Sequence, residues 1–125
     1  CFPAVAPFDV TLIKTKDNIC VVQPDVMIIC DKETITEEGR YKGVPTLAVE
    51  VLSKSTRGKD MLVKLNLYAQ TGVAEYWVVD TDNRMVKMWA FKDNQIDILI
   101  TYHDGEILES YTFNGLALKL SDIFV

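Results

Sequence analysis

The sequence predicts a mixed α/β domain, in which a central β-sheet has at least one helix packed across it. Two observations support this fold class. Short apolar segments of strand length occupy the first 52 residues, and a single amphipathic helical segment separates them from a second series of strand-like segments. The chain has 125 residues, 49% of them hydrophobic. This length and composition are typical of one globular domain with a substantial core, so we assign residues 1–125 to a single domain.

The first half of the chain contains four strand candidates. "FDVTLI" alternates apolar and polar residues and leads into the turn-like "KTKDN", which favours a hairpin with the following "ICVV". Pro24 separates that strand from "DVMIIC", because proline has no N–H to donate to a ladder. The polar "DKETITEEGRYKG" is expected to be a long loop, and "TLAVEVL" is the next strand.

A helix is expected after this strand, within "SKSTRGKDMLVKLNLYAQTG". Ser55 or Thr56 is suited to cap its start, and Gly72 is suited to end it. An apolar stripe follows helical spacing and consists of Met61, Leu65 and Tyr68, widened by Leu62 and Ala69.

The second half of the chain reads as antiparallel strands. "EYWVVD", "RMVKMWAF", "QIDILITY" and "YTFNG" follow one another at short spacing, and "TDNR" and "KDNQ" are turn-like. "LSDIF" is expected to form a terminal helical turn.

Charge and cysteine content restrict the class of protein. The formal net charge of −5 argues against a strong non-specific nucleic-acid binder, yet residues 40–64 carry a net +4 while the remainder carries −9. This basic segment is either a solvated face or a landing site for phosphate. No apolar run is long enough to span a membrane. The three cysteines are an odd number without C-x-x-C spacing, so we expect free thiols, a reducing compartment and a cytoplasmic protein.

Two carboxylates lie in apolar strands. Asp25 opens "DVMIIC", and Glu50 interrupts "TLAVEVL". Because strand side chains alternate, Glu50 shares a face with Ala48 and Leu52. A buried carboxylate is costly unless it is paired with a cation, protonated or bound to a metal.

Two interpretations of Glu50 remain open from the residues alone. In the first, Glu50 forms an ion pair with Lys64 of the following helix or with Lys54 just beyond the strand. In the second, Asp25 and Glu50 on neighbouring strands hold a divalent cation, since Mg²⁺ commonly takes one or two carboxylates together with water and substrate phosphate.

Four ordered blocks resemble the Uma-two family, a group of restriction-endonuclease-like proteins in the PD-(D/E)xK nuclease superfamily. They are "QPDVMIIC", "PTLAVEVLSKSTRGKD", "VKLNLYAQTGVAEYWVVDTD" and "FNGLALKLSDIF". The resemblance implies a mixed central β-sheet flanked by helices, with a metal-dependent nuclease site at one end. It also implies that an N-terminal portion of the family domain, including a helix, is absent from the chain.

The resemblance implies roles for particular residues. Asp25 and Glu50 take the places of the two acidic residues that bind Mg²⁺ or Mn²⁺, and the main-chain carbonyl of Val51 would be a further metal ligand. The strict pattern has lysine at position 52, where this chain has Leu52. The catalytic lysine is therefore expected on the helix as Lys64.

Three further residues are expected in supporting roles. Lys54 is the second choice for the lysine. Tyr68 follows Lys64 in a D-x-x-x-K-x-x-x-Y pattern and is expected to be either a core residue or a hydrogen-bond donor to the site. Gln23 beside Pro24 is expected to contact either a ligand or the backbone.

The leading functional hypothesis is an endonuclease that hydrolyses DNA phosphodiesters with Mg²⁺ or Mn²⁺. The alternative is a family member that keeps the fold as a binding or assembly module without cleavage. A homodimer is a reasonable expectation for either function, because two-fold pairing is the commonest assembly of proteins. The strand edges of the second half are candidates for its interface.

Overall fold

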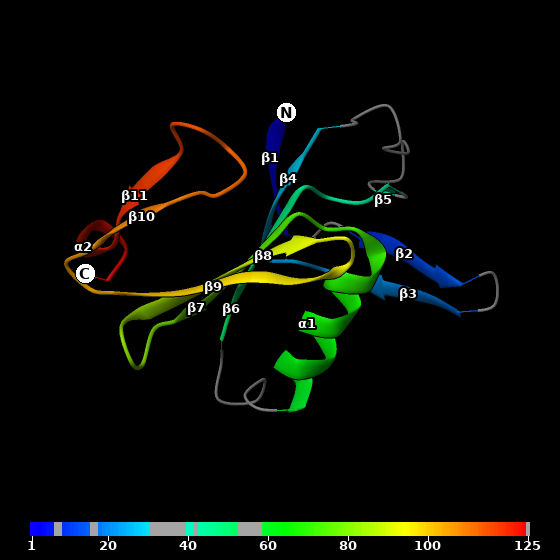
Figure 1. Cartoon of the computed structure of the whole chain (residues 1–125), viewed down its shortest axis with the longest axis horizontal. Coiled ribbons are helices and arrows are strands. Elements are labelled where there is room, and N and C mark those ends of the chain that lie inside the picture. Colours follow the sequence, from blue (N-terminus) through cyan, green and yellow to red (C-terminus); the bar gives the residue numbers. More distant parts are fainter. Residues whose placement is uncertain (7–8, 16–17, 31–39, 42, 53–58, 125) are drawn as a thin grey trace.

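The computed structural model describes residues 1–6, 9–15, 18–30, 40–41, 43–52 and 59–124. Its main sheet has six strands in the order β1-β4-β6-β7-β8-β9 (Figure 1). These strands are β1 (Phe2–Val5), β4 (Val26–Ile29), β6 (Leu47–Val51), β7 (Glu75–Asp80), β8 (Met85–Lys92) and β9 (Gln95–His103). The mixed α/β architecture predicted from the sequence is confirmed.

The centre of the sheet is formed by β6 and β7, which pair in parallel from Leu47–Glu75 to Val51–Val79. Parallel neighbours need a crossover connection, and the helix α1 (Lys59–Thr71) lies in that connection. All other pairs in this sheet are antiparallel. The strands predicted at 75–80, 84–91 and 95–102 correspond to β7, β8 and β9, and their predicted antiparallel order is thus confirmed.

The helix α1 ends as its sequence predicts. Gly72 has a φ of 96°, a left-handed conformation that costs little only for glycine. The N–H of Val73 then donates to the carbonyl of Tyr68 at 3.1 Å, which satisfies one of the last helical carbonyls. The predicted stripe is buried at Leu65, Tyr68 and Ala69, whereas Leu62 is 57% exposed and does not belong to it.

The two faces of the main sheet carry separate apolar clusters. The helix-side core packs against α1 and comprises Val10, Leu12, Met27, Ile29, Ala48, Leu65, Leu67, Tyr68, Val73, Tyr76, Val78 and Trp89. The opposite-side core comprises Leu47, Val49, Trp77, Val79, Val86, Met88, Leu108, Leu120 and Phe124. The alternation predicted for the strand around Glu50 is therefore confirmed, because Ala48 and Val49 fall in different clusters.

Two small sheets complete the described part of the chain. A hairpin of β2 (Asp9–Thr15) and β3 (Asn18–Val22) carries a short parallel neighbour, β5 (Arg40–Tyr41), and lies beside α1 in Figure 1. The second sheet pairs β10 (Ile107–Glu109) with β11 (Ala117–Lys119), followed by the short helix α2 (Leu120–Ile123). The hairpin and the terminal helical turn were predicted. The prediction of a strand at 111–115 was wrong, because this segment belongs to the loop between β10 and β11.

A disulfide joins Cys1 and Cys30. The pairing of β1 with β4 sets Phe2 opposite Ile29, so the residues that flank this pair, Cys1 and Cys30, are cross-strand neighbours. The expectation of three free thiols was wrong for these two, while Cys20 lies outside the disulfide. The cytoplasmic location was inferred from three free thiols. The disulfide removes this argument, and the location stays a prediction. Among the described helices, none combines the length and apolarity that a membrane span requires.

Candidate active site around Glu50

Glu50 lies near the end of β6 and projects from the sheet toward α1. It is 8% exposed, which makes it one of the few charged residues in the described core. Its place follows from strand alternation: Ala48, two residues earlier, belongs to the helix-side core, and Leu52, two residues later, packs at the margin of the same cluster. The chain thus directs a carboxylate into an apolar layer beneath a helix.

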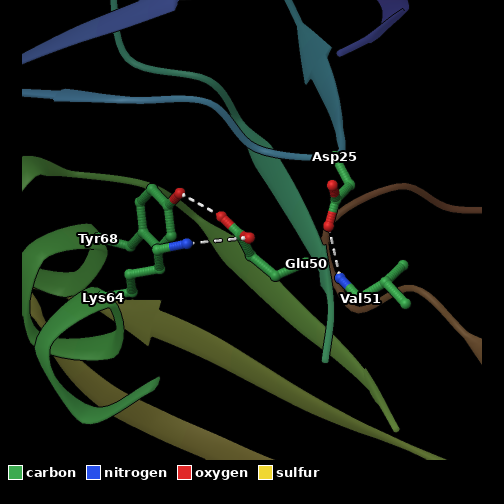
Figure 2. Close-up of polar contacts among 5 residues, drawn as sticks. All are labelled: Asp25, Glu50, Val51, Lys64 and Tyr68. Carbon is green, nitrogen blue, oxygen red and sulfur yellow. Dashed lines mark hydrogen bonds and ion pairs between the residues drawn. The ribbon is translucent and has the colours of Figure 1, made fainter. Parts of the chain in front are cut away.

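Two side chains of α1 bind the two oxygens of this carboxylate (Figure 2). The Lys64 Nζ lies 3.2 Å from Glu50 Oε2 and forms an ion pair with it, and the Tyr68 hydroxyl donates to Oε1 at 3.0 Å. Lys64 and Tyr68 are four residues apart, so one edge of the helix presents both donors to the same acceptor. The ion pair expected between Glu50 and Lys64 is confirmed.

Burial and charge act in opposite directions on Glu50. Desolvation by burial raises the pKa of its carboxyl group above 4.5, and this effect outweighs the lowering by Lys64 and by the two hydrogen bonds. The negative charge of Asp25 is a further, smaller cause that raises the same pKa. For Tyr68, burial and the neighbouring Glu50 raise the pKa of the phenol, which therefore stays protonated and keeps its role as donor.

Asp25 approaches β6 from the bend that precedes β4. Its Oδ2 accepts a hydrogen bond from the main-chain N–H of Val51 at 2.7 Å. Figure 2 shows that the Asp25 carboxylate points to the Val51 backbone, whereas the Glu50 carboxylate points to α1. Both carboxylates therefore lie near the end of β6, but they bind different groups: Asp25 binds the Val51 N–H, and Glu50 binds Lys64 and Tyr68.

The strand geometry also orients the carbonyl of Val51. Within a β-strand the N–H and C=O of one residue point to the same edge, and the Val51 N–H points to Asp25. We infer that the Val51 carbonyl lies along this edge as well. The side chain of Val51 is 46% exposed, so solvent reaches this end of β6.

The structure thus brings together Asp25, Glu50, Val51, Lys64 and Tyr68, all of which the sequence predicted for the site. Tyr68 combines the two roles that were left open, since it is fully buried and also donates to Glu50.

The remaining candidates lie elsewhere. The Gln23 amide donates to Asp9, its cross-strand neighbour at the start of β2, so its described contact is with neither carboxylate of the site. Lys54 falls outside the described residues, as do Lys42 and Arg57 of the basic segment.

The oxygen donors at this strand end fit a divalent cation such as Mg²⁺. Two carboxylates and one main-chain carbonyl are hard ligands, and two protein carboxylates are the number that Mg²⁺ commonly takes. Burial is the main cause that raises the pKa of Glu50, and repulsion by Asp25 is a smaller cause, which a nearby cation would relieve. In the described part of the chain, no group of three or more His, Cys, Asp or Glu side chains offers a closed metal cage.

Sequence reasoning overlooked a second buried carboxylate, Glu75 at the start of β7. It is fully buried and accepts hydrogen bonds from the Trp77 indole at 2.5 Å, from the Ser110 hydroxyl at 3.1 Å and from the Thr112 N–H at 2.8 Å. Glu75 therefore fastens the loop after β10 to the main sheet. Its position at the head of "EYWVVD" was the available signal.

Comparison with known proteins agrees with this fold. The Uma2 family, described as "Putative restriction endonuclease", matches residues 4–121. A crystal structure of a "putative nuclease belonging to DUF820" from Anabaena variabilis is similar over 98% of the chain, with a TM-score of 0.70 and 17% sequence identity. The chain spans 66% of the length of that protein. No curated protein matches the sequence.

Proposed function

Because the chain belongs to the Uma2 family of restriction-endonuclease-like proteins, we propose that it is a metal-dependent endonuclease that hydrolyses DNA phosphodiester bonds. The end of β6 is the proposed active site. It is open to solvent at Val51 and combines acidic residues with a lysine, groups that can assist hydrolysis of a phosphodiester.

Asp25 and Glu50, together with the Val51 carbonyl, would hold Mg²⁺ or Mn²⁺. When bound, such a cation supplies Lewis-acid stabilisation to the negative charge that develops on the phosphate. Glu50 is engaged with α1, so its carboxylate has to exchange part of its contact with Lys64 for this role.

Lys64 and Tyr68 act on water and on Glu50. The Lys64 ammonium is half-buried beside Glu50, where it orients a water molecule toward the phosphorus and offsets negative charge in the transition state. Tyr68 is a positioning residue, because its hydroxyl holds one Glu50 oxygen while its ring is fixed in the core.

The 3.2 Å contact between Glu50 and Lys64 carries this proposal. The strict nuclease motif supplies its lysine two residues after the glutamate on the same strand, and here that position is Leu52. In this chain an ammonium group contacts the Glu50 carboxylate from α1 instead of from the strand that carries Glu50.

The proposal is tested by cleavage of supercoiled plasmid and of single-stranded DNA with Mg²⁺ or Mn²⁺. We expect wild type and Glu109→Gln, a change at an exposed glutamate of β10, to cleave equally. Glu50→Gln and Lys64→Met are expected to reduce cleavage by at least ~100-fold, within the range assigned to general acid–base groups. Equal cleavage by wild type and Glu50→Gln would contradict the proposed mechanism.

One observation favours a second function, a binding or assembly module without cleavage. Both Glu50 oxygens are already bound by side chains of α1, an arrangement that also serves as a structural ion pair. A folded protein that binds DNA, shows no cleavage with either cation and binds no cation at this site would support the module.

A further inference from the structure

The edge strand β1 reaches the candidate active site through the last hydrogen bond of its ladder. Among the described strands it pairs only with β4, at one edge of the six-stranded sheet (Figure 1). Just beyond β1, the Ala6 N–H donates to the main-chain carbonyl of Asp25 at 3.0 Å. The Asp25 carboxylate in turn accepts from the Val51 N–H at 2.7 Å. Asp25 is therefore held from two sides, by β1 through its carbonyl and by β6 through its carboxylate.

The remaining contacts of β1 with the sheet are few. Hydrogen-bonded pairs alternate along an antiparallel ladder, so from Ala6 the next main-chain groups that face β4 are those of Ala4 and Phe2. The side chains of these two residues are half-buried against the helix-side core, whereas Pro3 and Val5 are exposed. A short segment with few buried apolar contacts separates from its neighbour at low free-energy cost. The ladder alone therefore holds β1 weakly.

The disulfide between Cys1 and Cys30 fastens the other end of this strand. The two cysteines flank the hydrogen-bonded pair of Phe2 and Ile29, so they form a non-hydrogen-bonded pair, in which side chains lie closest. Both cysteines are exposed, so a reductant in solution reaches the bond without any unfolding. Exposed disulfides are the ones that respond to reductants, whereas buried structural ones resist them. The crosslink is therefore both a support of β1 and accessible to chemistry.

We propose that this disulfide is a redox switch that controls metal binding at the end of β6 through β1 and Asp25. A dithiol reductant supplies two electrons and two protons. One of its thiolates attacks a disulfide sulfur, and its second thiolate then resolves the mixed disulfide. The S–S bond breaks, Cys1 and Cys30 become thiols, and the reductant is oxidised to its own disulfide. Without the crosslink, β1 separates from β4 and no longer holds the Asp25 carbonyl.

The effect of reduction is confined to one side of the site. β4 keeps its antiparallel pairing with β6, which does not involve β1. Glu50 keeps its contacts with Lys64 and Tyr68 of α1. Of the two carboxylates proposed to bind metal, reduction therefore loosens only Asp25. The oxidised protein has the complete site and the reduced protein a weaker one. This inference rests on the proposed metal site, and its two tests separate a failure of the switch from a failure of that site.

The tests compare proteins with and without the crosslink. Oxidised wild type contains the disulfide. Reduced wild type, separated from the dithiol after reduction, lacks it, and so does the double variant Cys1→Ser with Cys30→Ser. The matched control is Cys20→Ser, because this substitution also removes a cysteine but leaves the disulfide in place. Reduced wild type has the native sequence, so its agreement with the double variant assigns the effect to the bond and not to the substitutions.

Hydrogen exchange in the absence of metal measures the release of β1. In both proteins without the crosslink, we expect the amide protons of Ala6 and Val51 to lose protection, because Asp25 supplies the acceptor of each. The amide protons of β7 and β8 should keep their protection. Cys20→Ser should match oxidised wild type throughout. Unchanged protection of Ala6 after reduction, or an equal loss of protection in β7 and β8, overturns the switch.

Calorimetric titration with Mn²⁺ measures the effect on the site. We expect the double variant to bind Mn²⁺ at least ~10-fold more weakly than oxidised wild type, the loss typical when a group that orients a metal ligand is removed. Cys20→Ser should bind Mn²⁺ as tightly as oxidised wild type. Equal affinities of oxidised wild type and the double variant overturn the switch and leave the proposed metal site intact. Absence of binding by oxidised wild type overturns the metal site, and its redox control with it.

Discussion

Glu50 holds a negative charge in an apolar layer, and its stability effect depends on pH. Because burial raises the pKa of Glu50 in the folded protein above 4.5, ionisation lowers the free energy of unfolding as the pH rises through the folded pKa. The stability contribution of this group is thus full below about pH 4.5 and is lost as the pH rises through the raised pKa of the folded protein. The site trades stability for a charged oxygen donor.

This trade predicts that Glu50→Gln is at least as stable as wild type at pH 7. Glutamine keeps the shape of the side chain and cannot ionise, so the variant should lose less stability than wild type as the pH rises above about 4.5. Thermal unfolding followed by circular dichroism across this range measures the effect, with Glu109→Gln as the control. Parallel pH profiles for wild type and Glu50→Gln would show that Glu50 carries no such penalty.

Lys64→Met is expected to destabilise the protein at pH 7. The variant leaves Glu50 buried without its countercharge, and loss of one partner of a partly screened ion pair should cost about 1–3 kcal/mol. Urea unfolding measures this loss. The double variant Lys64→Met with Glu50→Gln should recover most of it, since no charge remains buried. Strictly additive losses would indicate that the two side chains are not coupled.

At the scale of elements, β1 is an edge strand held to β4 by ladder hydrogen bonds and by the disulfide between Cys1 and Cys30. β4 in turn positions Asp25, which precedes its first residue. The disulfide therefore supports the strand that follows Asp25 of the candidate active site.

Cys30→Ser is accordingly expected to lower the free energy of unfolding by about 3.6 kcal/mol, the magnitude assigned to a crosslink that closes a loop of this length. Thermal unfolding with and without a reducing agent measures the effect. Reductant should lower the melting temperature of wild type and leave that of Cys30→Ser unchanged. An equal response of both proteins would contradict a stabilising disulfide.

The contacts of Glu50 with α1 were predictable because the residues involved follow local periodicities. A period of two placed Glu50 on the face of Ala48, and a spacing of four placed Lys64 and Tyr68 on one helix edge. The contact partners of Glu75 were not predictable in this way, because Ser110 and Thr112 lie 35 and 37 residues away in the sequence. The disulfide was missed for a similar reason, since it depends on the pairing of β1 with β4.

At the scale of the whole molecule, the strand pair β6–β7 and its crossover helix α1 form most of the candidate site. The parallel pair β6–β7 requires a crossover, and that crossover is the helix that brings Lys64 and Tyr68 over Glu50. The remainder of the sheet supports this pair on both sides. Glu50 of β6 and Lys64 of α1 are therefore brought together by the crossover between two parallel strands, and not by one continuous sequence motif.

The most direct test of the central claim is Mn²⁺ binding measured by isothermal titration calorimetry in wild type, Glu50→Gln and Glu109→Gln. The claim predicts one saturable site in wild type and Glu109→Gln, with binding at least ~10-fold weaker in Glu50→Gln, a loss of about 1.4 kcal/mol. Lys64→Met should bind Mn²⁺ at least as tightly as wild type, because the ammonium no longer competes for Glu50. No saturable binding in wild type, or equal binding in wild type and Glu50→Gln, would contradict a metal site at the end of β6.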